Sequence, residues 1–377
     1  MIRVLLAMLF VLLTSSISLA EIQVKDWKIS FDAMIEFYSY YSTNSGNYPL
    51  DNSTSTDTDL VFEAGDGTRM RLAAENGPYK FFFDFREDNE FEYIWGEWNF
   101  GAGTVLLGRN DSLSWNPFML PPPTKSGIGQ LIGQPILDQA RITFPIGKTT
   151  LAVAALKPDN YYYETYKLEV GSGTKDVDAV LPTFEVKYDF PVGPFNLSLI
   201  GGMQKYTLID SSNDKYDINS DLLALIVRYR YEKLGLHATV FWDKNNYTHF
   251  DPRQKGLLFM APGSAAYFGG PAYDAAHDSI VDSETVEWAF SADYHVNDSL
   301  DLLFGCSGAN TEDDYGNEDE AIGYSALAII KLTDSVFAIP FVNYTDWGDR
   351  SPIDSGSIDE GTTTVYGVQW VYQWDIL

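Results

Sequence analysis

Basic side chains that alternate with apolar ones mark several stretches of the 377-residue sequence. Arg69 and Arg71 stand on either side of Met70, and Arg228 is followed by Tyr229. Successive side chains of an extended strand point to opposite faces, so each stretch places its charges on one face. A row of guanidinium groups attracts and orients charged solutes without reacting with them. We therefore predict an electrostatic site and no enzymatic activity.

The same alternation runs through most of the chain and predicts an all-β fold of about sixteen strands. Short turns and long polar loops connect these strands in turn, which is typical of a transmembrane antiparallel β-barrel with short periplasmic turns and long outer loops. The long connections are expected near 42–58, 87–90, 110–137, 157–180, 206–219, 244–279, 310–319 and 346–361.

The composition supports a barrel of this kind. Phe, Tyr and Trp make up 15% of the residues, yet the mean hydropathy is only −0.15. In a barrel, lipid-facing apolar residues alternate with lumen-facing polar ones, and aromatic residues gather at both interfaces. The formal net charge of −28 excludes nucleic acid as a partner, because phosphate binding requires a basic face.

The first twenty residues predict export from the cytoplasm. Arg3 precedes the apolar run 4–13, and Ala20 ends a small-residue cleavage site. The apolar run is too short to cross a bilayer as a helix. We therefore expect a signal peptide over 1–20 and an outer-membrane barrel over 21–377.

One long connection, 110–138, lacks alternation altogether. It holds five prolines and three glycines, which neither a helix nor a paired strand accommodates. Its apolar residues, such as Leu113, Trp115 and Ile128, need a surface to pack against. We expect this loop to fold into the bore, and the longer loop 244–279 is a rival for that position.

With this architecture the chain resembles the general porins of the Gram-negative outer membrane. The resemblance in motif is confined to about 95–145, where GEWNFGAGTVLLGRNDSLSW is similar to the strand, tight turn and strand that precede their constriction loop. It implies a homotrimeric, water-filled channel for passive diffusion of ions and small hydrophilic solutes. The acidic Pro-Glu-Phe-Gly-Gly signature of many such loops is absent, so this loop would constrict by bulk and packing.

In that family, basic side chains on the inner wall face the infolded loop and set a transverse field. The resemblance carries this role to Arg69, Arg71 and Arg141, with Lys80 and Arg86 beside them. The predicted pore-lining residues are the basic Arg69, Arg71, Lys80, Arg86, Arg141, Arg228 and Arg230 and the acidic Glu97, Asp111 and Asp138. The alternative is that the arginines only pair with Asp84, Glu97 or Asp138 across the wall.

Other motifs do not support a chemical step. The glycines of 127–133 have the wrong spacing for a dinucleotide fingerprint and follow prolines rather than a strand. The four histidines lack metal-ligand spacing, and the single Cys306 excludes an intrachain disulfide. We predict no cofactor and no metal site.

Acidic residues gather in the expected outer loops, above all in 312–320. Divalent cations could bridge them to lipopolysaccharide phosphates, and a solvated loop explains them equally well. Two other functions stay open. One is a substrate-specific channel with a binding site in the bore, to which Tyr93 and Trp95 would contribute. The other is a non-channel barrel that acts in adhesion or as an enzyme.

Overall fold

The computed structural model describes residues 22–45, 57–64, 68–86, 91–114, 136–157, 171–179, 181–245, 271–274, 276–346, 348–350, 358–359 and 361–375. Among these residues no helix is long and apolar enough to cross a membrane. The expected signal peptide, 1–20, lies outside the described residues and remains a prediction.

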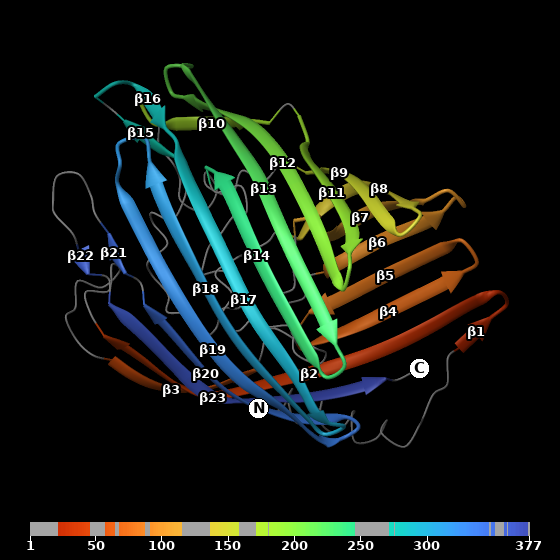
Figure 1. The fold of residues 1–377 in the computed structure, drawn as a ribbon. Helices are drawn as coiled ribbons and strands as arrows, with labels where there is room; N and C mark the ends of the chain where they lie inside the picture. Colours follow the sequence, from red (N-terminus) through yellow and green to blue (C-terminus); the bar gives the residue numbers. More distant parts are fainter. Residues whose placement is uncertain are drawn as a thin grey trace, which may run out of the picture.

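A closed antiparallel barrel of sixteen strands forms the molecule, which confirms the predicted fold class (Figure 1). Its wall consists of β2 (Trp27–Ser45), β3 (Asp57–Ala64) with β4 (Arg69–Asn76), β5 (Tyr79–Arg86), β6 (Phe91–Asn99), β7 (Thr104–Asp111), β8 (Ile136–Ile146), β9 (Thr149–Leu156), β10 (Thr174–Asp178) with β11 (Thr183–Val192), β12 (Phe195–Asp210), β13 (Lys215–Tyr231), β14 (Leu234–Lys244), β17 (Ser283–Asn297), β18 (Leu300–Asp313), β19 (Glu318–Thr333), β20 (Val336–Asp346) and β23 (Thr362–Asp375).

Two wall strands are interrupted. Both β3 and β4 pair with β2, and both β10 and β11 pair with β12, so each couple acts as one strand of the wall. The barrel closes where β23 pairs with β2 over fourteen residue pairs, from Asp32↔Asp375 to Ser45↔Thr362. The short β1 (Ile22–Val24) extends the wall sheet by pairing with the start of β2. Two separate short hairpins are formed by β15 (Ala272–Asp274) with β16 (Ser279–Val281) and by β21 (Asp349–Arg350) with β22 (Ile358–Asp359).

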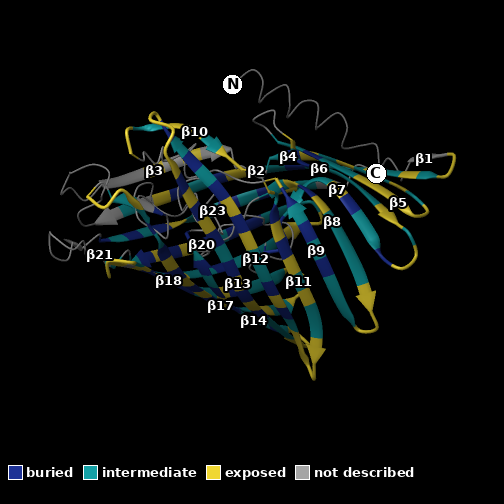
Figure 2. Ribbon diagram, turned by 90° about the horizontal axis from the view of Figure 1, so that it is seen from above, coloured by how far each residue is buried: buried dark blue, intermediate teal, exposed yellow. Residues whose placement is uncertain are grey.

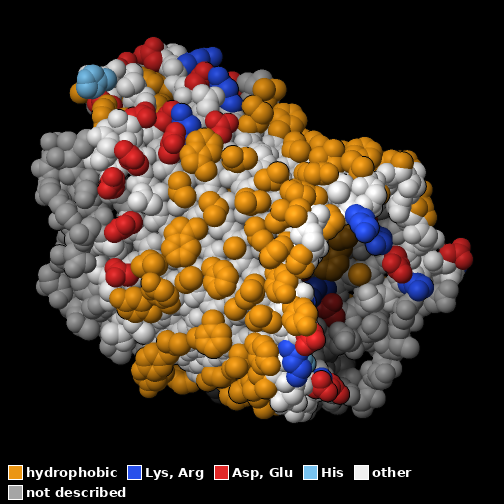
Figure 3. Space-filling model, viewed as in Figure 1, with side chains coloured by type: hydrophobic (Ala, Val, Ile, Leu, Met, Phe, Trp, Pro, Cys, Tyr) orange, Lys and Arg blue, Asp and Glu red, His pale blue; other side chains and the backbone are white. Residues whose placement is uncertain are grey.

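Burial alternates along the strands, as Figure 2 shows for β12, β13 and β17. On β13, Leu223 is 60% exposed whereas its neighbour Leu222 is 4% exposed. Exposed side chains of this kind form the outer face, and Figure 3 shows hydrophobic side chains covering it over the long strands. An apolar outer face and a separate inner face are what a bilayer requires of a barrel.

The wall is not equally tall around the barrel. Strands β4 to β9 have 8–11 residues each, whereas β12 and β13 have 16 and 17. Two expected long loops, 206–219 and 310–319, are therefore wrong. The polar residues there remain paired in strands, and four-residue turns join Asp210 to Lys215 and Asp313 to Glu318.

The long-loop end carries a small hairpin of β15 and β16 that packs against the wall. Tyr273 and Ile280 lie against Tyr216 and Ile218, whose side chains are buried on the inner face of β13. Tyr216 and Tyr273 both donate to Oδ1 of Asp278 at 2.7 Å, and these bonds lower the pKa of that carboxyl. The described end of loop 244–279 is thus fixed to the inner wall at the outer mouth.

Candidate functional site

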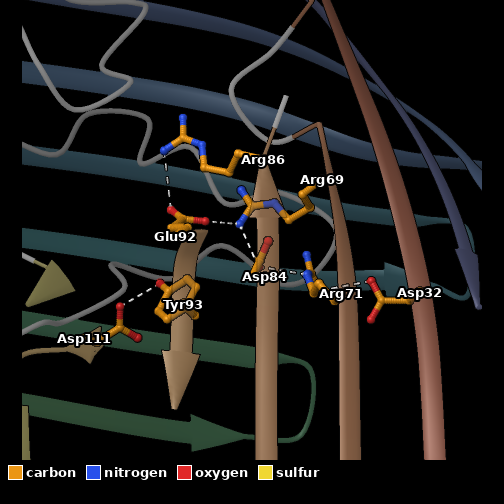
Figure 4. Close-up of polar contacts among 8 residues, drawn as sticks. All are labelled: Asp32, Arg69, Arg71, Asp84, Arg86, Glu92, Tyr93 and Asp111. Atoms are coloured by element: carbon orange, nitrogen blue, oxygen red, sulfur yellow. Dashed lines mark hydrogen bonds and ion pairs between the residues drawn. The ribbon is translucent and has the colours of Figure 1, made fainter. Parts of the chain in front are cut away.

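A network of charged side chains lies on the inner face of the first short strands (Figure 4). Asp84 of β5 is fully buried and stands between two arginines of β4. Its Oδ2 is 3.3 Å from Nη1 of Arg69 and 3.3 Å from Nε of Arg71. Met70 between the two arginines is 48% exposed on the outer face, so alternation places the pair inside as predicted.

A second carboxylate enters this network through a β-bulge. The register between β5 and β6 shifts after Asp84↔Tyr93 to Phe85↔Phe91, which leaves Glu92 unpaired in the ladder. The bulge turns Glu92 inward beside Tyr93. Glu92 then pairs with Nη1 of Arg69 at 2.5 Å and with Nη1 of Arg86 at 3.7 Å.

The network continues to both sides along the wall. Arg71 also reaches Asp32 of β2, with 3.7 Å between Nη1 and Oδ1. On the other side the hydroxyl of Tyr93 donates to Oδ1 of Asp111 at 2.7 Å, at the end of β7. These contacts match the alternative of ion pairing along the wall, with Glu92 and Asp32 as partners that the sequence did not suggest.

The other predicted lining residues, apart from Asp138, are spread over the inner wall. Arg141 of β8 lies within electrostatic range of Asp111, Glu97 and Glu185. Lys80 is exposed next to the turn between β4 and β5, and its cross-strand neighbour is Glu97. Asp138 is exposed on the face of β8 opposite to Gln139 and Arg141, because alternation turns it away from the bore. We therefore leave Asp138 out of the lining.

Arg228 and Arg230 lie farther round the barrel on β13. Arg230 pairs with Asp293 of β17 through a bifurcated contact, in which Nη2 donates to both carboxylate oxygens at 3.0 and 2.9 Å. His237 of β14 faces the same carboxylate, with 3.7 Å between Nε2 and Oδ1. In the described part of the chain, no group of three or more His, Cys, Asp or Glu side chains is placed to hold a metal ion.

The start of loop 110–138 turns onto the inner wall. Glu185 of β11 accepts hydrogen bonds from the backbone N–H groups of Leu113 and Ser114, at 2.5 and 3.2 Å, and from the Ser114 hydroxyl at 2.8 Å. Leu113 packs on the inward-facing Ala152 and Ala154 of β9. Residues 112–114 therefore cross β8 and β9 inside the barrel, and residues 115–135 lie outside the described part.

Part of the inner wall is apolar, which the alternation of polar and apolar residues did not predict. One buried cluster covers the inner faces of β2, β18, β19, β20 and β23, and a second covers β12 to β14. The first contains Met34, Tyr38, Tyr40, Leu303, Leu327, Ile329, Ile339, Phe341, Val365 and Val371, and the second contains Ile200, Leu222, Ala224, Ile226 and Phe241 with Ala289 of β17. None of these side chains is more than 8% exposed, so water has little contact with them.

Three aromatic rings lie on the charged side of the bore. Phe82 of β5 stacks on Trp95 of β6, with 5.6 Å between ring centroids, and meets Tyr93 edge-on at 6.2 Å. Tyr93 and Trp95 face inward, as predicted, because Ile94 between them is 39% exposed on the outer face.

No family model and no curated protein matches the sequence. The fold, however, superposes on solved outer-membrane structures. The outer membrane channel DcaP of Acinetobacter baumannii matches with a TM-score of 0.65, over 94% of this chain and 100% of that chain. The chain has the porin fold. An anion-selective porin from Comamonas acidovorans matches at 0.59 over 92% and 100%, and the trimer form of OmpT from Vibrio cholerae matches at 0.56 over 93% and 100%. Sequence identities are 16%, 13% and 10%, so the likeness concerns the fold.

Sequence reasoning missed several charged residues of the inner face. Glu185, Lys187 and Asp189 alternate with Phe184, Val186 and Tyr188, and this pattern would have placed all three charges inward. Glu92 is different, because simple alternation with Tyr93 assigns it to the outer face. Phe91–Asn99 contains no proline, and its glycine, Gly96, lies four residues after Glu92, so neither residue type marks the position of the bulge.

Proposed function

We propose that the chain forms a water-filled channel in the outer membrane of a Gram-negative bacterium, through which ions and small hydrophilic solutes diffuse passively. The observation that carries this proposal is the charged network inside a closed barrel with an apolar outer face. Charged side chains at membrane depth are costly unless they face protein partners or a water-filled cavity. Channels of this kind work through pore width and lining charge, without a chemical step.

The water path is expected to follow the charged side of the bore. Side chains of Arg71, Arg86 and Glu92 are 19%, 26% and 15% exposed, whereas those of the two apolar clusters are almost fully covered. Loop 110–138 is the proposed constriction, because its described start already lies across the inner wall. Loop 244–279 would narrow the outer mouth, where its described end packs on β13.

The proposed surroundings are the lipid bilayer, lipopolysaccharide and two further copies of the chain. Exposed apolar side chains on the outer face suit both lipid and subunit packing. One structure with the same fold was solved in a trimer form, which supports a homotrimer. Figure 3 shows acidic side chains along one margin of the apolar surface, near the long-loop end where lipopolysaccharide would lie.

The refolded chain is expected to produce discrete conductance steps in planar lipid bilayers. Because the path is water-filled, current should rise in proportion to voltage, and liposomes should take up small sugars faster than larger ones. A matched preparation that was boiled before addition serves as the control.

Absence of steps from a folded, heat-modifiable barrel would contradict a channel. The same recordings address a substrate-specific channel, which the ring cluster of Phe82, Tyr93 and Trp95 favours. A decrease of the current that saturates with the concentration of one sugar class would support that second function. A decrease that stays proportional to concentration and is similar for all sugars would support passive diffusion.

A further inference from the structure

A recess lies on the inner wall of the barrel, between the network of Figure 4 and the short turn that joins β4 to β5. Its volume is about 210 Å³, and β2, β4, β5 and β6 line it. Figure 3 shows the surface hollowed at the right, where Figure 1 places the short-turn ends of β4 and β5. Pockets for drug-sized ligands measure about 300 Å³ or more, so this recess suits one small solute.

The floor of the recess is a gap left by two small side chains. Cross-strand pairing places Ser30 of β2 beside Ala73 of β4. On the far side of Ala73 stand Phe82 of β5 and Trp95 of β6, whose rings stack with 5.6 Å between their centroids. The two rings form an aromatic wall beside the gap. An apolar or aromatic group of a solute that fills the gap would be removed from water and would contact this wall.

A row of charged side chains borders the gap on the side of the short turns. Lys28, Glu75 and Lys80 follow one another across β2, β4 and β5, and Glu97 continues the row on β6. Lys28 and Glu75 are 57% and 53% exposed, with 3.9 Å between Nζ and Oε1, so water and solutes reach both. The row has as many carboxylates as ammonium groups, and it therefore favours neither simple anions nor simple cations.

The charged row and the gap are separated by a fixed distance. Side chains on one face of a strand recur every second residue, about 6.7 Å apart, which is the step from Glu75 to Ala73. A solute that reaches both needs a charged head joined to an apolar group by a short link. An α-amino acid has this shape, because its ammonium can pair with Glu75 and its carboxylate with Lys28 or Lys80 while its side chain lies against Phe82. A sugar ring would use the aromatic wall but not the opposed charges.

We infer that this recess binds zwitterionic α-amino acids with apolar or aromatic side chains. The inference rests on the proposed channel function and adds a preferred solute to it. Exposed ion pairs contribute little free energy, so a bound amino acid is held weakly and leaves again, as conduction requires. The recess lies near the short-turn end of the bore, where a solute that enters through the outer mouth is released.

Four probes separate the chemical features of the solute. L-Phenylalanine carries both charges and a ring, phenylpropionate lacks the ammonium, phenylethylamine lacks the carboxylate, and glycine lacks the side chain. In planar bilayers, phenylalanine should lower the wild-type current in a saturable way. Its half-saturating concentration should be at least about threefold lower than that of each other probe. Equal or stronger action of any other probe would overturn a site for apolar zwitterions.

Two variants locate the site. Phe82→Ala removes the aromatic wall and should raise the half-saturating concentration of phenylalanine at least about fivefold. Glu75→Gln removes the partner of the ammonium, so phenylalanine should act no better than phenylpropionate. Phe83→Ala and Asp334→Asn are the matched controls and should keep the wild-type values. Phe83 is the next ring along β5 and faces outward with its cross-strand neighbour Leu72, and Asp334 is an exposed carboxylate of another short turn.

Open channels of Phe82→Ala and Glu75→Gln that respond to phenylalanine as the wild type does would overturn the amino-acid site and leave the channel function standing. A wild-type chain that opens no channel would contradict the channel function instead. In that case saturation-transfer NMR of the refolded proteins in detergent decides the site. Transfer to the phenylalanine ring protons that Phe83→Ala keeps and Phe82→Ala loses supports it, and equal transfer in all proteins, or none from the wild type, overturns it. Heat-modifiable migration on gels shows that each variant is folded.

Discussion

Replacing Glu185 by alanine is expected to enlarge the open channel and to destabilise the barrel. The buried carboxylate accepts three hydrogen bonds from Leu113 and Ser114, and nothing else in the described residues is seen to hold those two backbone groups. Its removal should release the start of the loop from the wall. Loss of hydrogen bonds to a charged, buried acceptor should lower the free energy of unfolding by about 3 kcal/mol. Single-channel recordings should show larger steps with more current noise, and urea titration gives the stability.

Thr183→Ala is the matched control for this variant. Thr183 lies two residues earlier on the same inner face of β11, is equally buried, and bonds to Gln204 rather than to the loop. It should lose some stability and keep the wild-type conductance. Equal conductance of Glu185→Ala and the wild type would show that the contact at 113–114 does not narrow the bore.

Replacing Asp84 by asparagine is expected to shift ion selectivity towards chloride. The change keeps the shape of the side chain but removes the charge that stands between Arg69 and Arg71, both 3.3 Å away. Arg69 is 4% exposed and would keep Glu92 but lose one of its buried carboxylate partners, so the free energy of unfolding should fall by about 3 kcal/mol. The reversal potential under a salt gradient and urea titration measure the two effects.

Asp334→Asn provides the comparison for Asp84→Asn. It removes the same charge from a turn where the carboxylate is 98% exposed and pairs with Lys331 at 2.8 Å. Exposed pairs contribute little to stability, so this variant should resemble the wild type in both measurements. A shift of the reversal potential in Asp334→Asn as large as in Asp84→Asn would mean that the inner network does not set the selectivity.

Alternation made most of the wall predictable from the sequence. A strand with one face in lipid repeats every two residues, and this period gave the strand number and the inward position of Arg69, Arg71 and Arg141. It also gave the outer face of the last strand, where Tyr366 is 48% exposed and Gln369 is buried. Polar residues were a less reliable guide to where a strand ends, because the polar Lys205 and Asp217 remain in paired strands above the apolar outer surface.

The details of the bore depend on contacts that the two-residue alternation of the strands does not reveal. Glu92 enters the network only through a one-residue shift between β5 and β6. The partner of Leu113 and Ser114 is Glu185, about seventy residues later in the chain and three wall strands away. The alternation did not reveal the apolar inner clusters either. Residues such as Ile339 and Phe341 alternate with outward apolar residues, so their stretch carries no polar signal for the inner face.

Cysteine accessibility tests the central claim most directly, namely that the water path follows the charged side of the bore. In a Cys306→Ser background, single cysteines would replace Arg86 on the charged side, the fully buried Ile339 on the apolar side, and Leu223, which is 60% exposed on the outer face. A water-soluble, charged thiosulfonate added to open channels should change the current rapidly only when position 86 carries the cysteine. An unchanged current at position 86, or an equally fast response at 339 or 223, would contradict the account.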